Sequence, residues 1–286
     1  MVVLVRFGEI ALKSRYVRRQ LRDRLVANIQ DMFAADRVEC ITEADEARVY
    51  VHTADPEAAR RILGRVFGVV SMSPAIEVPA DVGALRERVV QVASAALTSG
   101  ASFALRTRRT GTHPFTSQDL ARDLGAAVQA AVPGSRVDLS RPDLEFHVEV
   151  RQNRGFVFRE VWPGPGGLPL GSQGRALAVV DAAAGMVAAW MGMKRGCRVV
   201  VAAAEDGPDL DALRRWDTHL KVLPYRGPGD LPELVRVARA EALFIGTRWI
   251  GFDPSGRPAV PVPVFEPLIG LADEEVEGWA RRIRGA

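Results

Sequence analysis

The amino-acid sequence predicts two successive α+β units followed by a reduced α/β unit with a parallel, Rossmann-like sheet. Strand and helix patterns alternate through the first half of the chain, a stretch rich in glycine and proline follows, and a regular strand and helix alternation resumes after it. The chain has 286 residues, of which 48% are hydrophobic and 26% charged. This composition suits about two domains with a buried core, and it excludes disordered, collagen-like and coiled-coil classes.

The first unit, residues 1–75, has the pattern strand, helix, strand, helix. Its segments are VVLVRF, YVRRQLRDRLVANIQDMF, EARVYVHT and DPEAARRILGRVFG. In the long helix, apolar residues recur at spacings of three and four, with arginines toward the other side. These residues are Leu21, Leu25, Ile29 and Met32, and Arg15, Arg18, Arg19 and Arg22. Such an arginine face is either a solvated helix surface or a binding surface. Residues 71–79 are expected to be an extended link, because Pro74 and Pro79 interrupt regular structure.

The second unit, residues 76–163, begins with a helix and a strand, turns at TGTHPFTS, and continues with a helix and three strands. Its regular segments are VGALRERVVQVASAAL, SFALRTRR, SQDLARDLGAAVQAA, RVDLS, EFHVEVR and GFVFREV. We expect Ser117 to be the N-cap of the second helix, which would leave helix amides facing the preceding loop as an anion site. Arg106, Arg108, Arg109 and His113 lie nearby, and Phe115 could stack on an unpaired base. The alternative is an ordinary basic strand end with Phe115 in the core.

A linker at residues 164–175 precedes the third unit, residues 176–286. The third unit alternates ALAVV, DAAAGMVAAWMGMKRG, RVVVAAAE, PDLDALRRW, HLKVLPY, LPELVRVARAE and ALFIGT, which favours a parallel sheet covered by helices. Residues 176–193 carry one charge, Asp181, and approach transmembrane length, but this central charge and the many small residues favour a buried strand and a packed helix. A hairpin around DPSGRP and a helix, DEEVEGWARRI, complete the predicted unit.

Positive charge is concentrated in the first 175 residues, which contain 24 Lys and Arg against 20 Asp and Glu. The remaining residues contain 14 Lys and Arg against 15 Asp and Glu. The two cysteines and four histidines have no metal-ligand spacing, and no catalytic triad pattern occurs, so we predict neither a metal site nor catalytic residues. The apolar start is interrupted by Arg6, so we expect no secretion signal, no membrane span and a cytoplasmic location.

Many segments, in register along nearly the whole chain, resemble the tRNA 4-thiouridine synthetase family, also described as thiamine-biosynthesis sulfurtransferases. They include RFGEIALKSR, FGVVSMSPA, RTRRTGTHPFTSQDLARDLGAAV, VDLSRPDLEFHVEVR, VFREVWPGPGGLPLGSQG, AAWMGMKRG and EPLIGLADEEVEGWARRI. The resemblance implies a ferredoxin-like domain, a THUMP domain and a PP-loop ATP domain. It also implies a homodimer, and tRNA as the partner, with the THUMP domain holding its 3′ CCA end.

Transferred to this sequence, the resemblance and the basic pattern give one set of expected RNA contacts. They are Lys13, Arg15, Arg19, Arg106, Arg108, Arg109, His113, Phe115, Thr116 and Ser117.

The sequence departs from the family at the ATP loop, which has the form SGGxDS. The six loop positions fall on Val180, Asp181, Ala182, Ala183, Ala184 and Gly185, and none of them matches. We therefore expect no ATP and no magnesium, and we expect Asp181 to be the N-cap of the following helix instead. Cys40 and Cys197 are expected to be buried thiols rather than sulfur carriers. The family's sulfur-carrying cysteine would lie beyond the last matching segment.

The sequence thus predicts a tRNA-binding protein of this family whose ATP and sulfur-transfer chemistry has been lost, and which could serve a separate catalytic or sulfur-carrier chain. One alternative is a divergent tRNA sulfurtransferase, still acting in 4-thiouridine and thiamine biosynthesis, that binds ATP through other backbone amides and uses a partner's cysteine. Another alternative is an interaction scaffold that no longer binds RNA.

Overall fold

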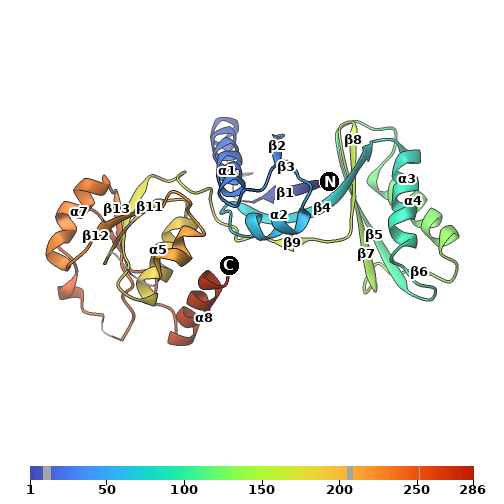
Figure 1. The fold of residues 1–286 in the computed structure, drawn as a ribbon. Coiled ribbons are helices and arrows are strands. Elements are labelled where there is room, and N and C mark those ends of the chain that lie inside the picture. The colour runs from blue at the N-terminus through green and yellow to red at the C-terminus, as the bar shows by residue number, and fades with distance from the viewer. Residues whose placement is uncertain (9–13, 205–208, 251) are drawn as a thin grey trace. The chain divides into compact units, whose positions relative to one another are not determined.

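A computed structural model describes residues 1–8, 14–204, 209–250 and 252–286 (Figure 1). Lys13, one of the expected RNA contacts, lies outside the described residues. The chain forms two compact units, each assembled from separate segments. The first comprises Met1–Leu4, Val51–Pro56 and Ser73–Trp162, and the second comprises Val5–Tyr50, Glu57–Met72 and Pro163–Ala286.

Up to residue 163, the described strands form one sheet in the order β2-β3-β1-β4-β8-β7-β5-β6, with β9 paired to β4. The first elements are β1 (Val2–Phe7), α1 (Arg15–Ala35), β2 (Ile41–Ala44), β3 (Val49–His52), α2 (Pro56–Leu63) and β4 (Val69–Pro79). The apolar stripe predicted for the long helix is confirmed, because Leu21, Leu25, Ile29 and Met32 are all buried. The hydrophobic spacing therefore fixes which side of α1 faces the core.

The expectation of an irregular link at residues 71–79 is wrong, because these residues belong to the 11-residue strand β4. Its last part pairs with β8, with Ile76 opposite Val157. Proline removes one backbone donor but keeps a φ compatible with extended structure, so a strand can contain it where that donor is not needed. Pro74 and Pro79 therefore lie within β4 and at its end.

The segment after β4 builds two helices on one face of the sheet. Its elements are α3 (Val82–Ser94), β5 (Ser102–Thr110), α4 (Ser117–Ala131), β6 (Arg136–Val137), β7 (Leu144–Arg151), β8 (Arg154–Phe158) and β9 (Trp162–Pro163). Strands β5 and β7 are parallel, with Arg106 opposite His147 and Arg108 opposite Glu149. Alternate residues of these strands, including Phe103, Phe146 and Val148, form a buried core with α3 and α4.

The last part of the chain is an α/β domain with the parallel strand order β12-β11-β10-β13-β14. Its elements are β10 (Arg175–Val179), α5 (Ala183–Lys194), β11 (Arg198–Ala203), α6 (Leu210–Arg214), β12 (Lys221–Pro224), α7 (Leu231–Ala238), β13 (Ala242–Phe244), β14 (Val264–Phe265) and α8 (Asp273–Arg284). Ala176 and Ala178 pack toward α5, whereas Leu177 and Val179 pack in the cluster that contains α7 residues. Both faces of β10 are therefore buried, as expected for a parallel sheet.

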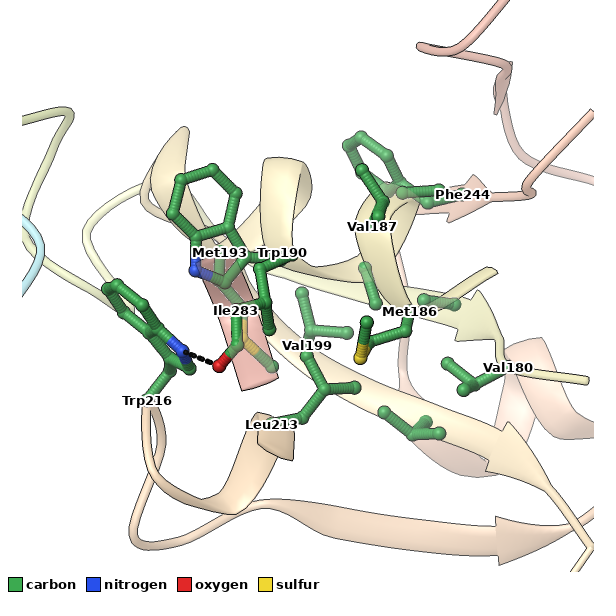
Figure 2. Packing of buried hydrophobic residues seen from close by; sticks show 14 of the residues in the cluster. Val180, Met186, Val187, Trp190, Met193, Val199, Leu213, Trp216, Phe244 and Ile283 are labelled. Carbon is green, nitrogen blue, oxygen red and sulfur yellow. Dashed lines mark hydrogen bonds between the residues drawn. The ribbon is translucent and has the colours of Figure 1, made fainter. Parts of the chain in front are cut away.

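Residues 176–193, which carry a single charge, form a strand and a helix, as predicted. Trp190, Met186 and Met193 of α5 are buried against β11, α6 and α8 (Figure 2). Within the described residues, each helix is too short or too polar to cross a membrane. The predicted hairpin around DPSGRP is wrong: Pro254–Gly256 form a short 3₁₀ turn, and β14 pairs in parallel with β13. The turn residues reverse the chain without bringing two antiparallel strands together.

Candidate RNA interface and nucleotide loop

The three arginines of β5 do not share one face. Successive side chains of a strand point to opposite sides, so Arg106 and Arg108 lie on one face and Arg109 lies on the other. The Arg108 side chain is exposed and makes no ion pair or hydrogen bond with another described residue. The three arginines therefore do not form the single positive patch that their proximity in the sequence suggested.

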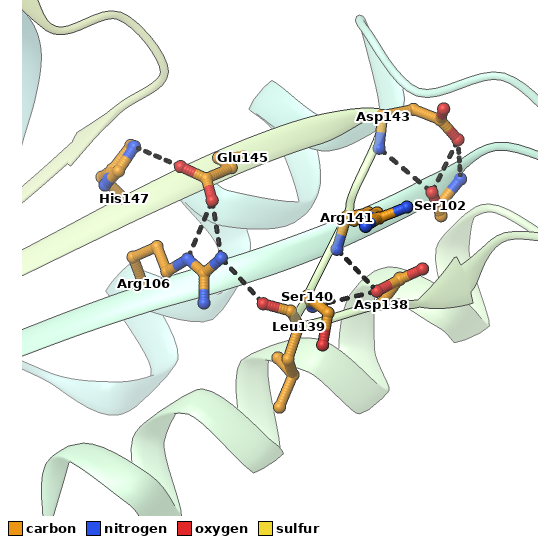
Figure 3. A network of polar contacts seen from close by, with 9 residues as sticks. All are labelled: Ser102, Arg106, Asp138, Leu139, Ser140, Arg141, Asp143, Glu145 and His147. Carbon is orange, nitrogen blue, oxygen red and sulfur yellow. Dashed lines mark hydrogen bonds and ion pairs between the residues drawn. The ribbon is translucent and has the colours of Figure 1, made fainter.

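Arg106 is held by the neighbouring strand β7 (Figure 3). Its Nε and Nη2 atoms donate to Glu145 Oε1 at 2.9 and 2.7 Å, and Nη2 also donates to the Leu139 carbonyl at 2.9 Å. Glu145 lies 3.6 Å from His147 as well. The glutamate cancels most of the local charge of Arg106 and fixes its guanidinium, leaving Nη1 pointed away from these partners in Figure 3.

Two carboxylates hold the segment that carries Leu139 in place. Asp143 Oδ2 accepts from the backbone N–H and the hydroxyl of Ser102 at 2.7 and 2.6 Å, which lowers the pKa of Asp143. Asp138 Oδ1 accepts from the N–H groups of Ser140 and Arg141, each at 2.9 Å, and these bonds lower its pKa. The carbonyl that contacts Arg106 therefore belongs to an ordered turn (Figure 3).

Arg109, His113 and Phe115 form a second group at the end of β5. Arg109 Nη1 donates to the Gly111 carbonyl at 2.7 Å and lies 3.5 Å from His113 Nδ1. The other ring nitrogen of His113 is 2.6 Å from the Gln152 carbonyl. Phe115 lies 5.3 Å from the His113 ring and packs, half-buried, against the core formed with α3 and α4. Phe115 therefore occupies a core position, the alternative that the sequence also allowed, and does not present a free stacking surface.

Thr116, not Ser117, is the N-cap of α4, so the predicted cap is one residue too late. Thr116 Oγ1 accepts from the Asp119 N–H at 3.1 Å, and the Asp119 carboxylate accepts from the Thr116 hydroxyl and N–H. These bonds lower the pKa of Asp119. The pattern Thr-x-x-Asp was a readable signal for this capping box. Asp119 places a negative charge at the N-terminus of α4. This carboxylate therefore already offsets part of the positive potential at the expected anion site.

The arginine face of α1 is exposed at its start. Ser14 caps the helix by accepting from the Val17 N–H, and Arg15 and Arg19 are exposed. The side chain of Arg19 is 78% exposed, and its one ion pair with another described residue is a long 3.8 Å contact with Asp23. Arg22 instead donates to Asp23 at 3.0 Å and to the Asp45 carbonyl. Arg15 and Arg19 are thus available to a polyanion, and Arg22 is used inside the fold.

The six positions of the family's ATP loop follow β10: residues 180–182 precede α5, and residues 183–185 are the first three residues of the helix. Helix α5 begins at Ala183 with Ala182 as N-cap, and no side chain caps it. The prediction that Asp181 caps this helix is wrong, because the first helical hydrogen bond runs from the Met186 N–H to the Ala182 carbonyl. Asp181 precedes the cap and is exposed. No hydroxyl group lies in the loop.

Gly185, the remaining loop position, is required for packing. A Cβ on Gly185 would lie 2.4 Å from the Val179 carbonyl oxygen, and one on Gly246 would lie 2.5 Å from the Gly185 nitrogen. The segment after β13 therefore lies directly against the first turn of α5. Both glycines allow backbone to approach backbone.

Two carboxylates, those of Asp181 and Asp230, act on Tyr225 at this edge of the sheet. Burial raises the pKa of Tyr225, and the nearby carboxylates of Asp181 and Asp230 raise it further. Asp230 also accepts from the Arg226 side chain, which lowers the pKa of this aspartate.

Neither cysteine is activated. Burial raises the pKa of Cys40, and burial followed by the Glu241 carboxylate raises that of Cys197. In the part of the chain that the structure describes, no three His, Cys, Asp or Glu side chains are grouped so that they could hold a metal ion.

Two family models match the first part of the chain. The model described as the ThiI ferredoxin-like domain matches residues 2–73, and the THUMP domain model matches residues 79–159. The ferredoxin-like and THUMP fold is followed by the parallel-sheet α/β domain described above. This combination defines a class of THUMP-containing proteins with an α/β domain after the THUMP domain.

The chain belongs to the tRNA sulfurtransferase family. It is 39% identical to a probable tRNA sulfurtransferase of Methanothermobacter thermautotrophicus, over 99% of this chain and 84% of the relative. It is 38% identical to a probable tRNA sulfurtransferase of Methanosarcina acetivorans, over 86% of this chain and 62% of that protein. The chain thus spans less than two thirds of the second relative.

Solved structures share the whole fold. The crystal structure of PH1313 from Pyrococcus horikoshii Ot3 matches with a TM-score of 0.86 at 27% identity, covering 99% of both chains. A 4-thiouridine synthetase in complex with RNA and ATP matches with a TM-score of 0.78 at 18% identity, covering 99% of this chain and 84% of that one. The expected fold, a ferredoxin-like domain, a THUMP domain and an α/β domain, is confirmed.

Proposed function

We propose that this protein binds tRNA through the basic end of its THUMP domain and the exposed arginines of α1. Family membership and the THUMP domain support tRNA as the partner. Arg108 supplies an exposed cation on β5, and Arg15 and Arg19 supply exposed cations on α1. Arginines of this kind neutralise phosphates and release counterions, which makes binding sensitive to salt.

We further propose that this chain has lost the ATP-dependent chemistry that its resemblance to the 4-thiouridine synthetase family implies. The observation that carries this proposal is the start of α5, where the residues do not fit a triphosphate. Ala182, Ala183 and Ala184 offer no hydroxyl, and the backbone at Gly185 is closed by the segment that contains Gly246. The Asp181 carboxylate would repel phosphate instead of binding it. A helix N-terminus without these changes is a favourable phosphate site.

The thiols support the same proposal for sulfur transfer. A sulfur carrier needs a thiolate in a positive, accessible place, whereas the pKa values of Cys40 and Cys197 are raised. The aligned span with the Methanothermobacter relative has 335 positions, more than the 286 residues of this chain. That relative therefore contains residues that have no counterpart here.

In this proposal the protein acts in the cytoplasm and presents the tRNA acceptor end to a separate catalytic or sulfur-carrier chain. The homodimer implied by the family remains a prediction. Deleting the gene should lower 4-thiouridine in bulk tRNA, and unchanged levels would remove the presenting role while leaving tRNA binding untouched.

The alternative function is a divergent tRNA sulfurtransferase, which the names of the curated relatives favour. ATP binding separates the two proposals. A ligand at 100 times its dissociation constant stabilises a protein by about 2.7 kcal/mol. We expect no such stabilisation by ATP and magnesium, measured by thermal unfolding, and a clear rise in Tm would establish the alternative.

The direct test of tRNA binding compares tRNA with and without its 3′ CCA end at low and near-physiological salt. An Arg106/Arg108/Arg109 triple alanine variant should lose the CCA-dependent part of the affinity. The matched control replaces three exposed arginines of the α/β domain, Arg226, Arg236 and Arg281, by alanine and should bind like wild type. Weak binding that ignores the 3′ end in all three proteins would favour an interaction scaffold that no longer binds RNA.

A further inference from the structure

An exposed aromatic side chain, Trp249, follows β13. The Trp249 side chain is 69% exposed and Ile250 is 83% exposed. All five tryptophans lie in the described part of the chain; of the other four, Trp162, Trp190 and Trp216 are buried and Trp279 is half-buried. Trp249 and its neighbour Ile250 therefore form a small exposed apolar patch.

Trp249 is the outer member of a layered stack. Its ring lies 6.3 Å from the Phe252 ring at an interplanar angle of 15°. The Arg257 guanidinium lies 5.6 Å from the centroid of the Phe252 ring. Arg257 is in turn held by Glu266, which is nearly fully buried and accepts from Nε at 2.9 Å. The buried Glu266 thus holds Arg257, Arg257 contacts Phe252, and Phe252 contacts Trp249, whose exposed indole can stack on another planar group.

We propose that Trp249 is a stacking platform for an unpaired nucleobase of the bound RNA. A base has the flat aromatic face that would continue the series from Arg257 through Phe252 to Trp249. Stacking on an aromatic residue is the usual way in which proteins hold single-stranded RNA without reading its sequence. This inference rests on the proposed tRNA binding and adds a contact in the α/β domain.

The size and surroundings of the patch favour a base over a protein partner. A stable protein interface needs about 800 Å² on each side. Here the two exposed apolar residues are followed by the exposed and mostly polar segment 253–257. One indole and one isoleucine are too small for a stable interface between copies of this chain, but they are sufficient for one or two bases.

The position of the platform in the fold agrees with this ligand. The segment that contains Trp249 leaves β13 at the carboxyl edge of the parallel sheet, and Gly246 of the same segment packs on the first turn of α5. In doubly wound α/β domains, ligands approach at this edge. An RNA strand at Trp249 would therefore pass the edge at which the family's nucleotide loop lies.

Tryptophan fluorescence gives a direct test, because Trp249 is far more exposed than the other four tryptophans. Addition of a single-stranded oligouridylate should quench the emission of wild type, and the quenching should be lost in Trp249→Phe. An RNA duplex of the same length is the ligand control and should quench less. No difference in quenching between wild type and Trp249→Phe would overturn the proposal.

Affinity for intact tRNA provides a second, independent readout. Trp249→Ala should weaken binding about tenfold, because one stacked base contributes roughly that factor, whereas Trp249→Phe should retain most of the affinity. Ile41→Ala, a change at another exposed apolar residue, is the control and should bind normally. If wild type binds tRNA and Trp249→Ala binds equally well, the stacking platform is disproved but the proposed tRNA binding still holds. If wild type binds no tRNA, the proposed function fails as well.

Discussion

The Arg106 guanidinium donates two hydrogen bonds to a single oxygen of Glu145, at 2.9 and 2.7 Å. An arginine expected to meet RNA is therefore paired with a carboxylate from the neighbouring strand. The pair is about 40% exposed on both sides, so its contribution to stability is small. Its main effect is to set the charge and the orientation of Arg106.

Replacing Glu145 by alanine should strengthen tRNA binding and increase its salt dependence. The change releases one positive charge, which should raise the salt slope by about one unit if Arg106 then contacts a phosphate. The free energy of unfolding should fall by less than about 1 kcal/mol, as for other exposed pairs. Binding isotherms at several salt concentrations check this, and an unchanged slope would place Arg106 outside the RNA interface.

The true N-cap of α5 predicts opposite results for two neighbouring substitutions. Asp181→Ala should change the free energy of unfolding by less than about 0.5 kcal/mol, because Asp181 caps nothing. Ala182→Ser should stabilise the protein by about 1 kcal/mol, since it supplies the missing cap. Urea unfolding of both variants tests these expectations. If Asp181 were the N-cap, as predicted from the sequence, Asp181→Ala would be the destabilising substitution.

The glycine at the start of α5 should tolerate no side chain. Gly185→Ala is expected to cost roughly 2 kcal/mol or more, because its Cβ would overlap the Val179 carbonyl. Gly278 lies in α8, where a Cβ would have no other atom within 4 Å, so Gly278→Ala should stabilise by about 0.5 to 1 kcal/mol. Thermal unfolding measures the stability of both variants. If Gly185→Ala changed the stability no more than Gly278→Ala, the close packing at Gly185 would be relaxed in solution.

The capping box of α4 makes a further pair of predictions. Thr116→Ala should destabilise the protein by about 1 kcal/mol, and Ser117→Ala should have little effect. Denaturant unfolding at neutral pH compares them directly, and a larger loss in Ser117→Ala would restore the cap predicted from the sequence.

The same cap should depend on pH in a defined direction. The pKa of Asp119 is lowered in the folded protein, so its contribution is complete above the ordinary value of 3.8 and disappears as the pH falls through the lowered pKa. The difference between wild type and Thr116→Ala should accordingly shrink only below about pH 3.8. A difference that vanishes near pH 6 would mean that another group titrates.

Local patterns were reliable where one face of an element is buried. The spacing of Leu21, Leu25 and Ile29 predicted the inward side of α1. The run at residues 176–193, which carries a single charge, predicted a strand and a buried helix. The strand at residues 69–79 was missed, because proline weakens a strand pattern in the sequence although neighbouring strands can still pair around it.

The arrangement of the candidate RNA contacts did not follow from their positions in the sequence. Arg106, Arg108 and Arg109 are close together in the sequence, yet the pleat of β5 separates them between two faces. The capping role of Asp119 was readable from its spacing to Thr116. The pairing of Arg106 with Glu145 was not readable, because the two residues are 39 positions apart and meet only through the register of β5 and β7.

The fold class and the family follow from the amino-acid sequence, because both depend on residue types and on their spacing along the chain. Three other properties required the folded chain: Asp181 is not a cap, Glu145 neutralises Arg106, and Trp249 continues a stack begun by Arg257. Each of these depends on the distance between groups brought together by chain packing or helix geometry, and residue spacing alone does not specify such distances.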